Sequence, residues 1–184
     1  GMQKKVLSEI DLYGGTIDSP KGFEIKRDIL KNQILDSFIK EKRISENIKD
    51  YSYSDYVVEY SQANQWLQDY IRDHFNVDYQ KTLIPKLNWG NVYEYNQKSF
   101  SRNTVDPVDL RNAADYTFIY GVDVGKDSTG VIIEYDDNRR KGRTWHIPLH
   151  NNKFVMFPST QKYFISPNKS EQINVILTTT YEYI

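Results

Sequence analysis

Two histidines in the C-terminal third of this 184-residue chain, His146 and His150, lie four residues apart and could bind a metal ion. His146 and His150 have a spacing that places both side chains on one face of a β-strand. Imidazole nitrogens in such a pair can bind zinc or iron. Pro148 lies between them and indicates an edge strand, and no carboxylate follows at a matching spacing. We predict no metal site, and keep His146 with His150 as the alternative.

Three other groups of residues could in principle do chemistry. Gly125–Ser128 resembles a phosphate-binding loop, but Asp127 follows the lysine and the upstream glycine is missing, so we interpret it as a hairpin turn. The basic run Asn138–Arg143 could contact phosphate or an acidic partner, although a short charged run is usually a solvated turn. Asp106, Asp109 and Asp115 surround one loop without a histidine partner. We interpret them as helix caps and surface residues.

Composition excludes several classes of function. The chain has no cysteine, so it has no disulfide, thiolate nucleophile or cysteine-based metal site. Its formal net charge of −1 gives no reason to expect a nucleic acid as partner. No run approaches the roughly 18 apolar residues of a membrane span, and the start lacks the apolar stretch of a secretory signal. We expect a cytoplasmic protein with no membrane partner.

The length and the hydrophobic pattern predict a single domain over residues 1–184. Residues 3–82 are expected to be mainly helical, with an edge strand over Lys5–Tyr13 and a Gly14-Gly15 turn. Apolar residues recur at helical spacing from Ile25 to Ile39 and from Ser54 to Asn76, which predicts two amphipathic helices. Each has a polar face, so both must pack on another element.

Residues 83–184 have the pattern of short strands separated by turns. The predicted strands are Asn91–Tyr95, Tyr116–Val124, Gly130–Tyr135, Arg143–Leu149, Phe154–Phe157, Tyr163–Ile165 and Ile173–Tyr181. No helix separates them, which favours an antiparallel sandwich or barrel. We predict an α+β fold, in which the two N-terminal helices pack on one sheet of a jelly-roll body.

Short motifs make this expectation more specific. They are Thr117-Phe-Ile-Tyr120, Gly130-Val-Ile-Ile-Glu-Tyr135, Phe157-Pro-Ser159, Pro167-Asn168 and Gln172-Ile173. In their order, from Leu87 to Leu177, the chain resembles the cupin-like double-stranded β-helix of iron(II)/2-oxoglutarate oxygenases, especially the prolyl-hydroxylase-like enzymes of bacteria and phages. The resemblance covers about half of the chain. It implies a jelly roll with a metal and cosubstrate site inside.

The resemblance also shows where the chain departs from that family. Catalysis there implies two histidines and one carboxylate on Fe(II), and a cation that binds 2-oxoglutarate. Alignment on Phe157-Pro-Ser159 puts Tyr163 at the distal histidine and Gln172 at the cation. The first His-x-Asp pair falls on Asn103 and Val105, with Asp106 one residue further. We therefore predict no cofactor, with Fe(II) and 2-oxoglutarate as the alternative.

Three hypotheses on function follow. The preferred one is a pseudoenzyme whose pocket, formed by Asn103, Val105, Asp106, Tyr163 and Gln172, binds a small polar ligand or a protein. The second is an active Fe(II)/2-oxoglutarate dioxygenase in which His146 or His150 serves as a ligand. The third is a structural or assembly jelly roll, for example phage-encoded. A homodimer is the alternative to a monomer, and a stable oligomer would favour the third hypothesis over a monomeric binding protein.

Overall fold

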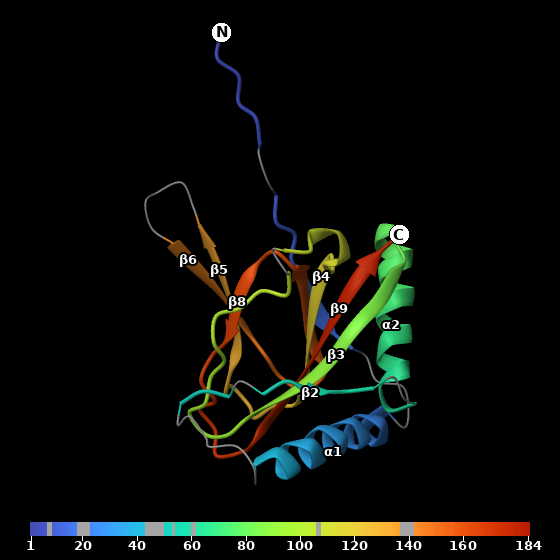
Figure 1. Cartoon of the computed structure of the whole chain (residues 1–184), viewed down its shortest axis with the longest axis vertical. Coiled ribbons are helices and arrows are strands. Elements are labelled where there is room, and N and C mark those ends of the chain that lie inside the picture. The colour runs from blue at the N-terminus through green and yellow to red at the C-terminus, as the bar shows by residue number, and fades with distance from the viewer. Residues whose placement is uncertain are drawn as a thin grey trace.

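The computed structural model describes residues 1–6, 9–17, 23–42, 50–52, 54–59, 62–105, 108–136 and 142–184. The helices in these ranges are α1 (Phe23–Lys42), α2 (Gln62–Tyr79) and the short 3₁₀ helix η1 (Leu110–Asn112). The strands are β1 (Tyr13–Thr16), β2 (Tyr56–Val57), β3 (Leu83–Tyr93), β4 (Tyr116–Asp123), β5 (Gly130–Asp136), β6 (Gly142–Pro148), β7 (Lys153–Pro158), β8 (Lys162–Ile165) and β9 (Asn174–Tyr183). Figure 1 shows their arrangement.

The strands form two antiparallel sheets. The larger sheet has the order β1-β7-β4-β9-β3-β2, and the smaller has the order β6-β5-β8. An isolated bridge between Arg102 and Tyr163 adds one more segment beside β8. From β3 onward the chain passes back and forth between the two sheets, which is the winding of a double-stranded β-helix. The predicted α+β jelly roll is confirmed.

Strand alternation gives the larger sheet two buried faces. Along β4, Phe118 and Tyr120 belong to one hydrophobic cluster and Ile119 to the other. The first cluster also contains helix residues such as Leu30 and Leu67, so this is the outer, helix-covered face. The second contains residues of β5, β6 and β8 and lies between the sheets. We call the face toward the smaller sheet the inner face.

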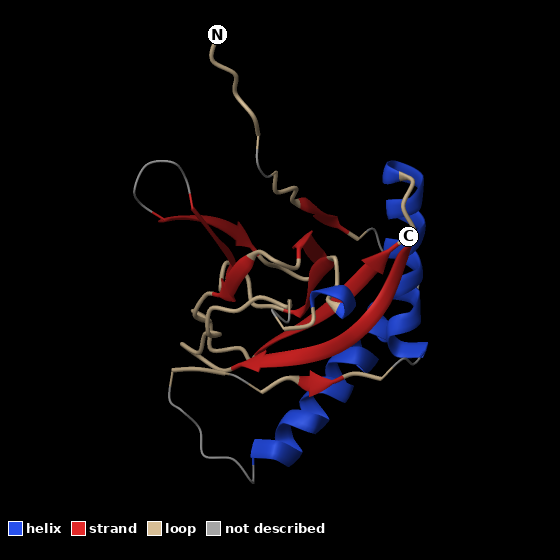
Figure 2. Cartoon of the chain, turned by 45° about the horizontal axis from the view of Figure 1, so that its top comes forward, coloured by secondary structure: helices blue, strands red, loops and turns tan. Residues whose placement is uncertain are grey.

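Both helices cover the outer face of the larger sheet, as Figure 2 shows. Leu30 and Ile34 of α1 and Leu67 and Ile71 of α2 are buried against it. Gly90 of β3 lets α1 approach closely, because a Cβ atom there would lie 2.6 Å from the Ile34 side chain. The predicted packing of the N-terminal helices on one sheet is confirmed.

Four expectations for the N-terminal half were wrong. The second helix begins at Gln62 rather than Ser54, because residues 56–57 pair with the edge of β3 as β2. The first strand covers residues 13–16, so Gly14-Gly15 is strand rather than turn. Strand β3 begins at Leu83, eight residues before the predicted start. Pro85 hid this extension, and its place is a register irregularity near the sheet edge.

The helices in the described ranges are too short or too polar to cross a membrane.

Gly121 of β4 provides a test of this packing. A Cβ atom at this position would lie 2.2 Å from the carbonyl oxygen of His150. We expect Gly121→Ala to lower the free energy of unfolding by about 1–3 kcal/mol in urea denaturation, because the backbone must shift. At Gly14 of β1 the nearest atom would lie at 3.5 Å. Gly14→Ala is therefore the matched control, with an expected change below about 1 kcal/mol. Equal losses in both variants would contradict this account.

Candidate functional site

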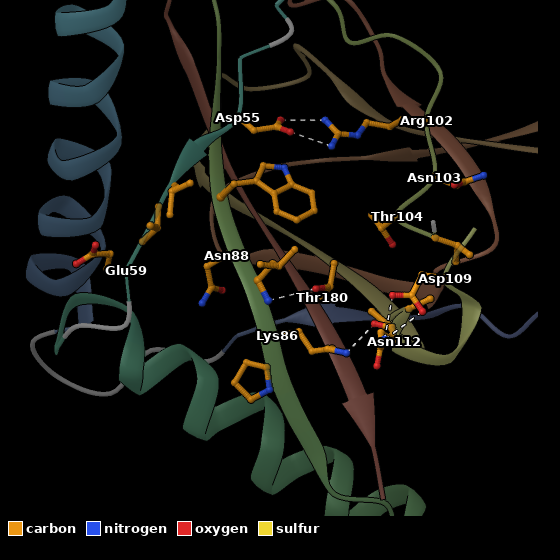
Figure 3. Close-up of a pocket in the computed structure, with 18 residues that line it drawn as sticks. Asp55, Glu59, Lys86, Asn88, Arg102, Asn103, Thr104, Asp109, Asn112 and Thr180 are labelled. Carbon is orange, nitrogen blue, oxygen red and sulfur yellow. Dashed lines mark hydrogen bonds and ion pairs between the residues drawn. The ribbon is translucent and has the colours of Figure 1, made fainter. Parts of the chain in front are cut away.

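A cavity of about 1020 Å³ opens where the inner face of the larger sheet extends past the smaller one. Its floor comes from β3 and β9, and its sides come from residues 55–59 and from the segment between β3 and β4. Leu87 at this end of β3 is 62% exposed. The lining residues are Asp55, Val57, Val58, Glu59, Pro85, Lys86, Leu87, Asn88, Trp89, Arg102, Asn103, Thr104, Val105, Asp109, Asn112, Ala113, Ala114 and Thr180. Figure 3 shows the site.

Backbone pairing turns Arg102 and Thr104 toward the inside of the roll. The amide nitrogens of Arg102 and Tyr163 each donate to the other residue's carbonyl oxygen at 2.9 Å. Such a pair places both side chains on one face, and the residue two positions on shares that face. The guanidinium carbon of Arg102 accordingly lies 5.2 Å from the centre of the Trp89 ring system. The Thr104 hydroxyl lies 2.7 Å from that of Thr117 on β4.

Asp55 binds Arg102 through both carboxylate oxygens, at 2.9 and 3.0 Å. The Asn91 amide of β3 donates to the same carboxylate at 2.8 Å and to the Ser54 carbonyl at 2.9 Å. The pair therefore connects three separate segments at one end of the cavity (Figure 3). Burial disfavours the charged form of Arg102, but the hydrogen bonds that its guanidinium donates to Asp55 outweigh this effect and raise the Arg102 pKa above its usual range.

Aromatic side chains fill the interior beside this pair. Tyr93 and Tyr163 are 2% and 3% exposed, and Phe157 packs edge-on against Tyr163 with ring centres 5.2 Å apart. Burial raises the pKa of Tyr163 to about 12 and that of Tyr93 still further. Both phenols are neutral at physiological pH. A neutral phenol is a weak ligand for iron(II). The interior beside the Asp55–Arg102 pair therefore presents aromatic rings and phenol hydroxyl groups, which are poor metal ligands.

A chain of hydroxyl groups connects the cavity to the Phe157-Pro-Ser159 motif. The Ser159 hydroxyl lies 3.0 Å from that of Thr117, which in turn contacts Thr104. The Ser159 carbonyl accepts from the Thr104 amide at 3.3 Å, and the Ser159 amide donates to the Asp115 carbonyl at 2.9 Å. The motif thus fixes the segment that carries Arg102 and Thr104 against β4.

The structure separates the residues predicted for the site. Asn103 and Val105 line the cavity, and Tyr163 is buried in the interior next to it. Gln172 is exposed, donates to Asp123 at 3.0 Å and is absent from the cavity lining. Asp106 lies outside the described residues. Arg102 and Thr104, each one residue before the predicted Asn103 and Val105, are the residues that the pairing with Tyr163 turns inward.

The histidines point elsewhere. His146 is opposite Ile132 in the β5–β6 pair, while the neighbouring pair Val131 and Ile147 faces the core between the sheets. The His146 side chain is therefore directed away from the interior. His150 follows the end of β6 and is exposed. The expectation that these two share a strand face was wrong, because β6 ends at Pro148.

An iron(II) facial triad needs two imidazoles and a carboxylate around one point. In the described part of the chain, no three His, Cys, Asp or Glu residues lie close enough together to hold a metal ion. The facing positions 102 and 163 hold an arginine already paired with a carboxylate and a buried phenol. These residues do not fit the metal that the fold implies.

Sequence reasoning missed Asp55, Trp89 and Arg102 as site residues. Asp55 lies in a stretch whose pattern predicted a helix, so no signal pointed to the cavity. Arg102 and Thr104 have the same two-residue spacing as the predicted Asn103 and Val105. The spacing alone therefore does not separate the two registers. The strand pairing that selects Arg102 over the next register is a tertiary contact.

Solved structures with the same fold are iron(II)/2-oxoglutarate oxygenases. The viral collagen prolyl hydroxylase of Paramecium bursaria Chlorella virus-1, in a 2OG complex, matches with a TM-score of 0.59 and 14% identity, over 95% of this chain and 96% of that one. A Pseudomonas putida prolyl-4-hydroxylase matches at 0.62 and 9% identity, over 93% and 92%. The α-ketoglutarate-dependent carbocyclase SnoK from nogalamycin biosynthesis matches at 0.64 and 10%, over 92% and 78%.

No protein-family model and no curated protein matches the sequence significantly. At these low identities the likeness establishes the fold. The chain has the double-stranded β-helix of the iron(II)/2-oxoglutarate oxygenases, including the prolyl hydroxylases.

The Asp55–Arg102 pair should contribute measurably to stability. Asp55→Asn keeps the shape but removes the charge that compensates Arg102. We expect the free energy of unfolding to fall by about 1–3 kcal/mol in urea denaturation, a range that allows for both side chains being about a third exposed. The control is Asp69→Asn, which breaks a surface pair with Arg72 on α2 and should cost below about 0.5 kcal/mol. If Asp55→Asn lowers the free energy of unfolding no more than the control does, the pair does not stabilise the fold.

Tyr163 makes stability depend on alkaline pH. The phenol ionises near pH 10 in the unfolded chain and near pH 12 in the folded one, so the folded state binds its proton more tightly. This contribution is complete below pH 10 and is lost as the pH rises from 10 to 12. Tyr163→Phe should make the decline in unfolding free energy over that interval smaller by about 1–3 kcal/mol. An unchanged decline in urea titrations at pH 9 and pH 12, roughly the ends of this window, would contradict the assignment.

Proposed function

We propose that this chain is a ligand-binding protein that uses the oxygenase fold without iron(II)/2-oxoglutarate catalysis. Its ligand, a small molecule or a protein segment, binds in the cavity between Trp89, Arg102 and the loop that carries Asn112. One observation carries the proposal. The two positions that face each other across the paired strands hold Arg102 and Tyr163, and Asp55 already neutralises the arginine.

Three further features support the proposal. The interior next to the cavity is filled by Tyr93, Tyr163 and Phe157, and hydroxyl contacts through Ser159 hold its wall in place. The cavity outside this filled region is large enough for a drug-sized ligand. Its lining combines apolar walls with a few convergent polar groups, which is typical of binding sites for small molecules.

An active iron(II)/2-oxoglutarate dioxygenase is the second candidate. It is favoured by the solved structures of this fold, which include prolyl hydroxylases and a carbocyclase dependent on α-ketoglutarate. Such an enzyme would need His146 or His150 to move toward the interior, since Arg102 and Tyr163 cannot replace imidazole ligands.

Succinate release separates the two candidates. The chain is incubated with iron(II), 2-oxoglutarate and oxygen, and we expect no succinate above a buffer control, because the inward-facing side chains do not bind the metal. Uncoupled turnover of 2-oxoglutarate by the unchanged chain would contradict the proposal and support the dioxygenase.

A designed variant provides the positive control. Arg102→His, Thr104→Asp and Tyr163→His together place two imidazoles and a carboxylate on one inner face, so this triple variant should bind iron(II) in calorimetry. The matched variant Asn103→His, Val105→Asp and Tyr163→His shifts the pair by one residue and should bind it at least about tenfold more weakly. The reverse order of affinities would mean that the inward register is wrong.

A further inference from the structure

The cavity contains a hydrogen-bond donor that has no acceptor. Trp89 is 7% exposed, and its indole nitrogen is buried without a partner in the described part of the chain. An indole N–H can only donate, and a buried donor without an acceptor is costly. Trp89 lines the cavity. Trp89 therefore has an unmade hydrogen bond within the wall of the cavity.

Arg102 adds further donors at the same place. Its guanidinium carbon lies 5.2 Å from the centre of the Trp89 ring system, so the two side chains form one wall. The guanidinium group offers five N–H donors in a planar fork. Asp55 accepts from two of its nitrogens. A wall that consists of a guanidinium and an indole N–H has the chemistry that recognises a carboxylate.

The Asp55 carboxylate, which belongs to the chain itself, occupies the guanidinium of Arg102 in this structure. It belongs to residues 54–59, whose β-pairing with β3 is limited to Tyr56 with Gly90 and Val57 with Trp89. A further bond from the Val58 amide to Asn88 extends the contact by one residue. The Asn91 amide also donates to the Asp55 carboxylate at 2.8 Å and to the Ser54 carbonyl at 2.9 Å. When the Asp55 side chain leaves Arg102, it gives up its two bonds to the guanidinium and the bond from Asn91.

The remainder of the cavity indicates the body of the ligand. Leu87, Val57 and Val105 provide apolar surface beside Trp89. Glu59 and Asp109 also line the cavity and lie away from the Asp55–Arg102 pair in Figure 3. The cation Lys86 lines the cavity too, but its ammonium already donates to the Asn112 carbonyl at 2.7 Å and lies 3.9 Å from Glu182. The carboxylates of Glu59 and Asp109 outnumber it and repel a second negative group on a ligand anchored at Arg102. The lining therefore favours one carboxylate on an apolar body over a dicarboxylate.

We propose that this cavity binds an apolar monocarboxylate at Arg102 and Trp89, and that Asp55 occupies the carboxylate position when the ligand is absent. This inference rests on the proposed binding function and names its ligand class. The incoming carboxylate replaces Asp55 on the guanidinium fork and accepts the free hydrogen of the Trp89 indole. No covalent step is involved.

Indole N–H signals in a ¹H–¹⁵N spectrum test the proposal directly. The chain has three tryptophans, and Trp89→Phe identifies the signal of Trp89. Trp66 contacts Tyr120 on the helix-covered face and Trp145 lies on β6, so both serve as internal references. Titration with benzoate should shift the Trp89 signal saturably and leave the other two in place. Benzamide, the neutral analogue, and inorganic phosphate should leave all three in place.

Asp55→Asn is the informative variant, because it removes the competing carboxylate and keeps the side-chain shape. Benzoate should bind this variant about tenfold more tightly than the unchanged chain, as expected when a charged hydrogen-bond competitor is lost. Asp69→Asn, the surface control, should leave benzoate affinity unchanged. Succinate should bind more weakly than benzoate because of Glu59 and Asp109.

Several outcomes would overturn the inference. They are no shift of the Trp89 signal with benzoate, equal shifts with benzamide or phosphate, or weaker benzoate binding to Asp55→Asn than to the unchanged chain. The titration of the unchanged chain decides the matter if that variant does not fold. Iron-dependent succinate release would contradict the proposed function whatever benzoate does. Absence of both turnover and benzoate binding would overturn the ligand class alone.

Discussion

The ion pair between Asp55 and Arg102 is the interaction on which the rest of the site depends. An arginine directed into a protein interior is tolerated only when its charge is compensated and its donors are bonded. Asp55 supplies both, and Asn91 holds Asp55 to β3. With Arg102 directed inward, the segment beside β8 adopts the register that also turns Thr104 inward. The ion pair thus stabilises the register that the backbone bridge between Arg102 and Tyr163 sets.

Polar contacts inside the protein maintain the open end of the roll. Ser159 and Thr117 connect β7 and β4 to Thr104, and the buried Asn168 amide donates to the carbonyls of Tyr93 and Gln172. Each buried polar group in these contacts has a hydrogen-bond partner, so the contacts hold the loops against the sheets. The motifs Phe157-Pro-Ser159 and Pro167-Asn168 therefore have a structural explanation that is independent of catalysis.

The fold and the site support different statements. Solved structures of similar shape are oxygenases, and the likeness establishes the double-stranded β-helix. Function depends on the side chains that a fold positions, and the same scaffold can host unrelated activities. Here the interior positions hold Tyr93, Tyr163 and Phe157, while the cavity beside them combines an indole, a guanidinium and apolar walls. The proposed binding function rests on these side chains of the cavity, and the fold alone does not specify it.

The sequence alone predicted an antiparallel sandwich or barrel with two amphipathic helices, because apolar residues recur with a period of 3.6 in the helices and the short strands follow one another without a helix between them. The resemblance to the oxygenases implied the winding of the jelly roll. It also placed Tyr163 next to the site through the spacing from Phe157-Pro-Ser159. Only the tertiary structure decided that Arg102 and Thr104, rather than Asn103 and Val105, face inward, since a shift of one residue exchanges the faces and a single bridge sets it. The positions of Asp55 and Gln172 relative to the cavity were also decided by tertiary contacts. Residues 56–57 form a strand because β3 offers an edge, and Gln172 turns outward to Asp123.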